Sequence, residues 1–160
     1  MIIRNSPNYE LMFHGTTKID FKDPISNKRG GGELGQGFYC GSSYHNAKVW
    51  AFIKANKKRN SISILCFEVD VVDLFSVDIR FLDELQANLL YEVLKIRSLQ
   101  RTFSLGCNII AANILGKKIE GVLQYKWESD ISISLINSNK VVRKEVDDTT
   151  GYNINIIAGK

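Results

Sequence analysis

The chain has 160 residues, of which 44% are hydrophobic and 24% are charged, and it contains only two prolines. This composition excludes disordered, collagen-like and low-complexity chains, and the length fits a single domain spanning residues 1–160. The formal net charge of +4 permits an anionic partner but does not require one. No apolar stretch approaches the roughly 20 residues of a membrane-spanning helix, and residues 1–5 lack the apolar region of a signal peptide. We therefore expect no membrane partner and a cytoplasmic location.

The cysteines and histidines argue against a disulfide framework and against a metal site. Cys40, Cys66 and Cys107 are an odd, widely spaced set, which is typical of a reducing compartment. Cys40 and His45 are five residues apart, but no second pair follows at the spacing of a zinc finger. We expect no bound metal.

The first half of the chain predicts a strand, a turn-rich segment, a helix and a further strand. Residues 10–14 form a strand-like run, and residues 18–36 contain an Asp-Pro pair and three consecutive glycines. Ser42 or Ser43 can cap a helix whose inner face carries alanines and Trp50. The β-branched and aromatic residues of segment 62–74 indicate one long strand or two short ones.

The second half predicts a mixture of helices and strands. Residues 81–99 place apolar side chains at helical spacing, which predicts an amphipathic helix; these are Leu82, Leu85, Leu89, Val93 and Ile96. We expect a buried strand over residues 107–115, a helix over 117–127, a strand over 131–136 and an edge strand in the tail after residue 148. The elements lack a regular βαβ rhythm, which favours an α+β fold with a mostly antiparallel sheet.

Two clusters carry the residues that suggest chemistry. The first is Phe13-His14-Gly15-Thr16-Thr17, after a strand, and the second is the run from Gly30 to Tyr39, before the capped helix. The glycine run is not a dinucleotide-binding fingerprint, because Cys40 replaces the third glycine of G-x-G-x-x-G. Taken separately, a histidine at a strand end and a glycine-rich turn are most often structural.

Taken together, the clusters have a specific order and spacing. His14-Gly15-Thr16, then Gly35-x-Gly37-Phe38-Tyr39, then a helix with Ala47 and Trp50-Ala51 resembles the ADP-ribosyltransferase superfamily, in its branch with His-Tyr-Glu motifs. The likeness is closest to a family of small, uncharacterised bacterial domains. It covers about residues 11–52 and implies a split, mostly antiparallel β-sandwich with flanking helices.

The resemblance also implies how NAD would bind as the substrate. His14 would form a hydrogen bond with a ribose hydroxyl, and the Gly15 backbone would pair with the nicotinamide carboxamide. Thr16 would offer its hydroxyl to the adenosine ribose or to the surroundings of His14. Tyr39 would stack on the nicotinamide ring, and Trp50 takes the place of a second stacking aromatic or packs in the core. Gly35, Gly37 and Phe38 of the same motif would complete the binding site.

The third motif of such enzymes supplies an acid or a glutamine at the head of a late strand. A carboxylate there would stabilise an oxocarbenium-like transition state, as in glycoside cleavage. Glu128 and Asp130 stand at the head of the strand expected over residues 131–136, and we favour Glu128 narrowly. Gln124 is the third option, if the segment before Trp127 is a strand rather than a helix.

Three functions follow from these residues. The first is an NAD-dependent ADP-ribosyltransferase that modifies a protein or a nucleic acid; it would fit a bacterial toxin, effector or phage-defence factor acting in its own or a target-cell cytoplasm, and a toxin would have a cognate antitoxin. The second is a non-catalytic module that binds NAD, ADP-ribose or nucleic acid. The third is a hydrolase with Cys107 as nucleophile and His14 as base, which the apolar neighbours of Cys107 disfavour.

Overall fold

The computed structural model describes residues 8–17, 23–58, 62–115 and 122–146, and the fold below refers to these ranges. Within them the strands and helices follow in the order β1 (Tyr9–Thr17), β2 (Gly31–Gly32), β3 (Gly35–Gln36), β4 (Phe38–Gly41), α1 (Tyr44–Lys58), β5 (Ile62–Asp70), α2 (Val71–Phe75), β6 (Ile79–Phe81), α3 (Glu84–Ile96), β7 (Ile109–Asn113), β8 (Leu123–Trp127), α4 (Asp130–Ile136) and β9 (Val142–Val146). None of the helices in these ranges has the length and apolar character needed to cross a membrane.

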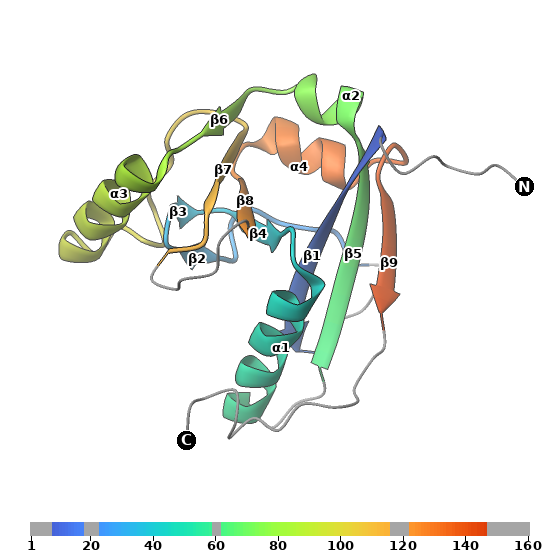
Figure 1. Ribbon diagram of the computed structural model, residues 1–160, viewed down its shortest axis with the longest axis horizontal. Coiled ribbons are helices and arrows are strands. Elements are labelled where there is room, and N and C mark those ends of the chain that lie inside the picture. Colours follow the sequence, from blue (N-terminus) through green and yellow to red (C-terminus); the bar gives the residue numbers. More distant parts are fainter. Residues whose placement is uncertain (1–7, 18–22, 59–61, 116–121, 147–160) are drawn as a thin grey trace, which may run out of the picture.

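Seven strands form one sheet in the order β6-β7-β8-β4-β1-β5-β9, and β2 pairs with β3 in a small separate ribbon (Figure 1). Only β6 and β7 run parallel, whereas every other neighbouring pair is antiparallel. A mostly antiparallel sheet with flanking helices confirms the α+β prediction. The single register pair Phe13–Gly41 joins β1 to β4, so the sheet consists of two halves that meet at one point.

Helices cover both faces of this sheet. Alternate residues of a strand point to opposite faces, and β5 follows this rule. Ile64 packs with Ala47 and Ala51 of α1, while Leu65 and Phe67 join the main core on the other face, against which α4 packs. This main core also takes in Met12, Phe38, Trp127 and Ile136. A third cluster packs α3 against β7 through buried apolar side chains of both elements.

Helix α1 forms where the sequence predicts it. The Ser43 hydroxyl accepts a hydrogen bond from the Asn46 backbone N–H at 3.1 Å, which satisfies one donor of the first turn. Ala47 and Ala51 are buried as expected, but Trp50 is 45% exposed. The small alanines let the helix approach β1 closely. Because Trp50 is largely exposed, it is not part of the core.

Three expectations for the later elements need correction. The segment ending at Trp127 is the strand β8, not a helix, and residues 117–121 lie outside the described ranges. The segment 131–136 is the helix α4, not a strand, because the Ser129 hydroxyl accepts from the Ser132 backbone N–H and caps it. Residues 62–74 divide into β5 and the short helix α2, which begins at the Asp70 cap. The tail predicted as an edge strand lies outside the described ranges, and β9, which precedes it, pairs with β5.

Helix α3 exists as predicted, but most of the apolar stripe that predicts it faces away from the core. Leu82 packs partly on the cluster beside β7, whereas Leu85, Leu89, Val93 and Ile96 are exposed. The buried residues of the helix are Ala87 and Leu94. The helix is shorter than expected because Asp83 and Gln86 form a capping box at its start. Both sides of this helix are apolar, so periodicity alone does not show which side is buried.

Candidate functional site

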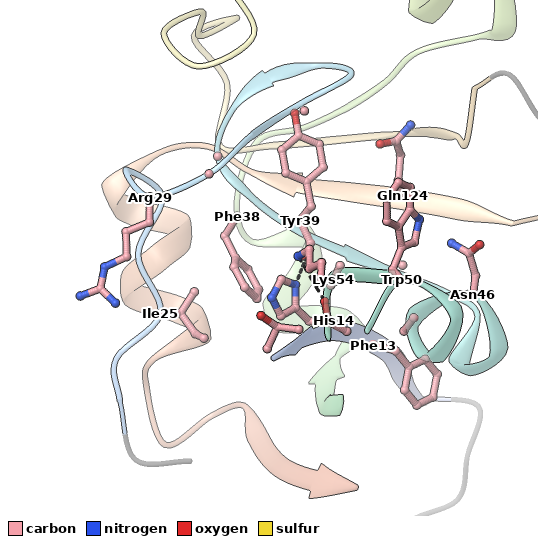
Figure 2. A pocket seen from close by; sticks show the side chains of 18 of the residues that line it. Phe13, His14, Ile25, Arg29, Phe38, Tyr39, Asn46, Trp50, Lys54 and Gln124 are labelled. Atoms are coloured by element: carbon pink, nitrogen blue, oxygen red, sulfur yellow. Dashed lines mark hydrogen bonds between the residues drawn. The ribbon is translucent and has the colours of Figure 1, made fainter. Parts of the chain in front are cut away.

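A pocket of about 530 Å³ opens where β1 and β4 diverge beyond their single pairing point. Its volume falls in the range of roughly 300–1,000 Å³ typical of small-molecule sites. Figure 2 shows His14 and Phe38 near its centre, Ile25 and Arg29 of the loop before β2 on one side, and Trp50 and Asn46 of α1 on the other. The pocket thus brings together both sequence clusters and the helix that follows them.

His14 lies on β1 and is neutral. Its Nδ1 lies 2.6 Å from the carbonyl oxygen of Tyr39, which can only accept a hydrogen bond, so Nδ1 carries the hydrogen. The pKa of His14 is lowered from 6.5 to about 4, mainly by burial. The hydrogen bond to Tyr39 opposes this shift, and the positive charges of Lys54 and Arg143 add to it. In this tautomer Nε2 is an acceptor, so His14 can receive a hydrogen bond from a ligand hydroxyl.

Tyr39 is fixed by the glycine turn that precedes it. Its hydroxyl donates to the Gly35 carbonyl at 2.5 Å and accepts from the Leu34 backbone N–H at 3.1 Å. The ring lies so close to Gly32 that a Cβ there would come within 2.8 Å of it, and Gly35 has a φ of +101°. Burial raises the pKa of Tyr39, so the phenol remains protonated. The glycines therefore serve to hold a flat aromatic wall of the pocket.

Gly15 lets α1 pack closely on β1, whereas the resemblance implies a role for it in binding the ligand. A Cβ at Gly15 would lie 1.8 Å from the Ala47 carbonyl oxygen, so α1 can pack on β1 only at a glycine. The Gly15 carbonyl accepts a bond from Lys54 Nζ at 3.4 Å. This close contact brings Trp50, on the same helix, to the pocket beside His14.

Gln124 of β8 is the third-motif candidate that the structure places in the pocket. The condition set for it, that its segment is a strand, is met by β8. Its Nε2 donates to Oε2 of Glu33 at 2.9 Å and to the Asn113 carbonyl at 3.2 Å. The Leu115 backbone N–H also donates to Oε2 of Glu33, at 3.2 Å. The pocket therefore contains a carboxylate that the sequence analysis does not name.

Glu128 and Asp130, by contrast, do not line the pocket. Glu128 is buried and lies 2.5 Å from Lys126 Nζ, and its Oε1 accepts from the Ser104 hydroxyl at 2.6 Å and the Gly106 backbone N–H at 2.7 Å. Burial alone would raise the pKa of Glu128, but these bonds outweigh it and lower the pKa. Asp130 is exposed at the start of α4 and accepts from Asn27 at 3.3 Å. Neither carboxylate meets His14.

The remaining predicted residues are divided between the pocket and its support. Thr16, Gly37 and Phe38 line it together with His14, Gly15, Tyr39 and Trp50, whereas Gly35 acts behind it through the Tyr39 hydroxyl. Cys107 is buried in the cluster beneath α3, and burial raises the pKa of its thiol. Cys107 does not line the pocket with His14, which removes the geometry that the hydrolase hypothesis requires.

Charged side chains at the pocket are mostly basic. Arg29, Lys54 and Arg143 line it, against the carboxylates of Asp23 and Glu33. The Arg143 guanidinium, on β9, donates to the Asp23 backbone carbonyl at 2.5 Å and so ties the loop before β2 to the far half of the sheet. This balance suits a ligand that carries negative charge.

The sequence matches the model of a family described as a protein of unknown function (DUF3990) over residues 11–145. The chain belongs to this family. Every residue that lines the pocket falls within the matched range, so the pocket is part of the DUF3990 domain itself. No curated protein and no solved structure matches the chain.

Two lining residues illustrate what sequence reasoning missed. Glu33 is the one charged residue in the glycine-rich run from Gly30 to Gly37, and this isolation is a signal that could have identified it. Arg143 has no such signal, because it lies more than a hundred residues from either motif and reaches the pocket only through the pairing of β9 with β5.

Proposed function

We propose that this DUF3990 domain is an NAD-dependent ADP-ribosyltransferase that transfers ADP-ribose to a macromolecule and releases nicotinamide. The observation that carries the proposal is one pocket that holds His14, Tyr39, Trp50 and Gln124, which derive from four separate elements or motifs. A sheet whose two halves meet at one pair is also the arrangement expected of the split fold that the motifs resemble.

The binding half of the reaction follows from hydrogen-bonding capacity and charge. Neutral His14 would accept from a ribose hydroxyl through Nε2, because Nδ1 is committed to the Tyr39 carbonyl. The aromatic faces of Tyr39 and Trp50 would contact the nicotinamide or adenine ring. The basic side chains of Arg29 and Arg143 would favour the diphosphate, whose two negative charges need nearby cations.

For the chemical step, we assign the stabilising carboxylate to Glu33, positioned by Gln124. The bond between nicotinamide and ribose breaks, nicotinamide leaves as a neutral base, and positive charge develops on the ribose. A carboxylate held in a partly enclosed site stabilises that charge more strongly than it would in water. A nucleophilic O–H or N–H of the target then attacks the ribose carbon and loses its proton. Attack by water instead would give NAD hydrolysis.

The test measures nicotinamide release from NAD by the purified domain. Variants of pocket residues are compared with variants of the same residue types outside the pocket. His14→Ala, Gln124→Ala and Glu33→Gln are each expected to reduce release at least a hundredfold, the effect of losing one or two catalytic interactions. His45→Ala and Glu92→Gln change the same residue types outside the pocket and should leave release within twofold. Release unaffected by all three pocket variants would refute the proposed site.

A cell lysate with labelled NAD extends the same experiment to the target. A labelled product removed by protease would identify a protein, and one removed by nuclease would identify a nucleic acid. NAD binding that His14→Ala abolishes, without release or labelling in any lysate, would instead support a non-catalytic binding module. The position of Glu128 outside the pocket is the observation that favours this second candidate.

A further inference from the structure

Helix α3 carries an apolar stripe on the side that faces away from the sheet. Leu85, Leu89, Val93 and Ile96 are 68%, 58%, 48% and 79% exposed. Phe81, at the end of β6 just before the helix, is 60% exposed. Residues four apart on a helix lie on one face, and the four helical positions follow that spacing with one step of three. They therefore form one continuous ridge rather than scattered surface residues.

The opposite side of α3 is also apolar, which makes an exposed ridge unusual. Ala87 and Leu94 are buried, and Leu90 and Tyr91 pack partly on the same cluster beside Leu34 and Ile110. A helix that is apolar all round is normally buried. Figure 1 shows α3 at the margin of the molecule, where none of the described elements covers its outer side. The core already occupies one face, so the other face is available to a partner.

The charges of α3 indicate what that partner is. The helix starts with the acidic residues Asp83 and Glu84 and ends with the basic residues Lys95 and Arg97. The ridge lies between these ends, and Glu92 is the one charged residue along it. A two-fold axis across the helix places the acidic start of one copy beside the basic end of the other. The backbone dipoles are then also antiparallel, which is favourable at both ends. The charged ends of the helix therefore complement the charged ends of a second copy.

We propose that two copies of this chain form a dimer through antiparallel packing of their α3 helices, with the ridge from Leu85 to Ile96 at the interface. Leu85 of one copy lies against Ile96 of the other, and Leu89 and Val93 lie near the two-fold axis. Removing this apolar area from water provides the attraction, and the charged helix ends select the antiparallel direction. The proposal is independent of the activity of the pocket.

The first test measures molar mass by light scattering and sedimentation over micromolar to submillimolar concentrations. The wild-type chain is expected to be dimeric, and Leu89→Glu and Val93→Glu to be monomeric, with the dissociation constant raised at least a hundredfold. Val72→Glu is the matched control, because Val72 on α2 is also an exposed apolar residue, at 79%, away from the ridge. A monomeric wild type, or a dimer that both ridge variants leave intact, would overturn the proposal.

The second test distinguishes antiparallel from parallel packing by thiol cross-linking. Cys40, Cys66 and Cys107 are the three cysteines of the chain, and all are buried, so an added surface cysteine supplies the reactive thiol. The double variant Leu85→Cys/Ile96→Cys should cross-link between copies, whereas neither single variant should. A parallel pair would cross-link each single variant to itself, and that result would refute the antiparallel arrangement. Circular dichroism on every variant checks that the fold is retained.

Discussion

At the scale of single residues, the site depends on a histidine kept neutral by its surroundings. Burial is the largest cause that lowers the pKa of His14 to about 4, and the positive charges of Lys54 and Arg143 act in the same direction. The Tyr39 carbonyl opposes them, because it accepts a hydrogen bond that the protonated ring would also make. The ring therefore remains an acceptor at Nε2 throughout the physiological pH range.

The lowered pKa predicts a pH dependence of stability. Between pH 6.5 and about 4 the unfolded chain binds a proton at His14 that the folded chain does not, so stability falls as the pH falls through this window. Compared with His14→Gln, the wild type should lose about 3 kcal/mol of unfolding free energy from pH 7 to pH 4. Urea unfolding of both proteins at several pH values measures this difference. Parallel pH profiles would show that His14 is not buried as described.

At the scale of elements, β8 separates a polar group of the pocket from polar groups that support the fold. Gln124 and Lys126 of β8 point to the same face, since alternate residues of a strand share a face, and Glu128 follows directly after the strand. Gln124 lines the pocket, while Lys126 donates to the Leu34 carbonyl at 2.8 Å under the glycine turn. Glu128 is four residues, or about 13 Å of extended chain, beyond Gln124. Glu128 is therefore too far from Gln124 to reach the pocket.

This geometry predicts that Glu128 acts on stability and not on chemistry. Glu128→Gln leaves Lys126 as a buried charge without its counter-ion, which should cost about 3 kcal/mol of unfolding free energy. Adding Lys126→Met removes that buried charge and should recover much of the loss. Chemical denaturation measures both effects. Nicotinamide release per folded molecule should change less than threefold in Glu128→Gln, and its complete loss with stability intact would make Glu128 the catalytic acid after all.

At the scale of the whole molecule, the pocket depends on contacts between distant parts of the chain. The Asn137 side chain, after α4, accepts from the Ile25 backbone N–H at 2.8 Å and donates to its carbonyl at 2.9 Å. One amide thus holds the loop before β2, which supplies the pocket wall from residues 23–26. Arg143 fixes the same loop through the Asp23 carbonyl.

Removing the Asn137 side chain should loosen the loop at residues 23–26 without unfolding the molecule. Asn137→Ala leaves two backbone groups of Ile25 without their partner, so fewer hydrogen bonds hold the loop in position. We expect about tenfold weaker NAD binding, or 1.4 kcal/mol, with a modest change in the unfolding midpoint. Calorimetric titration measures the affinity, with Asn88→Ala on the exposed side of α3 as the control. Unchanged affinity would mean that the loop does not contact the ligand.

The early part of the fold and site could be predicted because its signals are local. A strand at residues 10–14, a serine cap at Ser43 and a glycine turn before Tyr39 each depend on a short stretch of sequence, and the structure has all three. The strand continues three residues beyond the predicted end at His14, because β1 pairs with β5 as far as Thr17. The later part was less predictable, because its patterns suggest the wrong elements. The apolar residues of segment 119–127 have helical spacing although the segment ends in a strand, and residues 131–135 alternate like a strand although they form a helix. The Ser129 cap makes α4 a helix, and the two-sided burial of β8 between β4 and β7 makes it a strand.

The sequence by itself determined the α+β class, the position of the two motifs and the residues His14, Tyr39 and Trp50 that meet in the pocket. Only the tertiary structure decided that Gln124 and Glu33 join them, that Glu128 is bound to Lys126, and that the apolar ridge of α3 faces outward. The physical reason is that motifs and caps depend on neighbours within a few residues. The partner of a side chain, and which of two apolar helix faces is covered, depend on strand order and on packing between elements far apart in the chain.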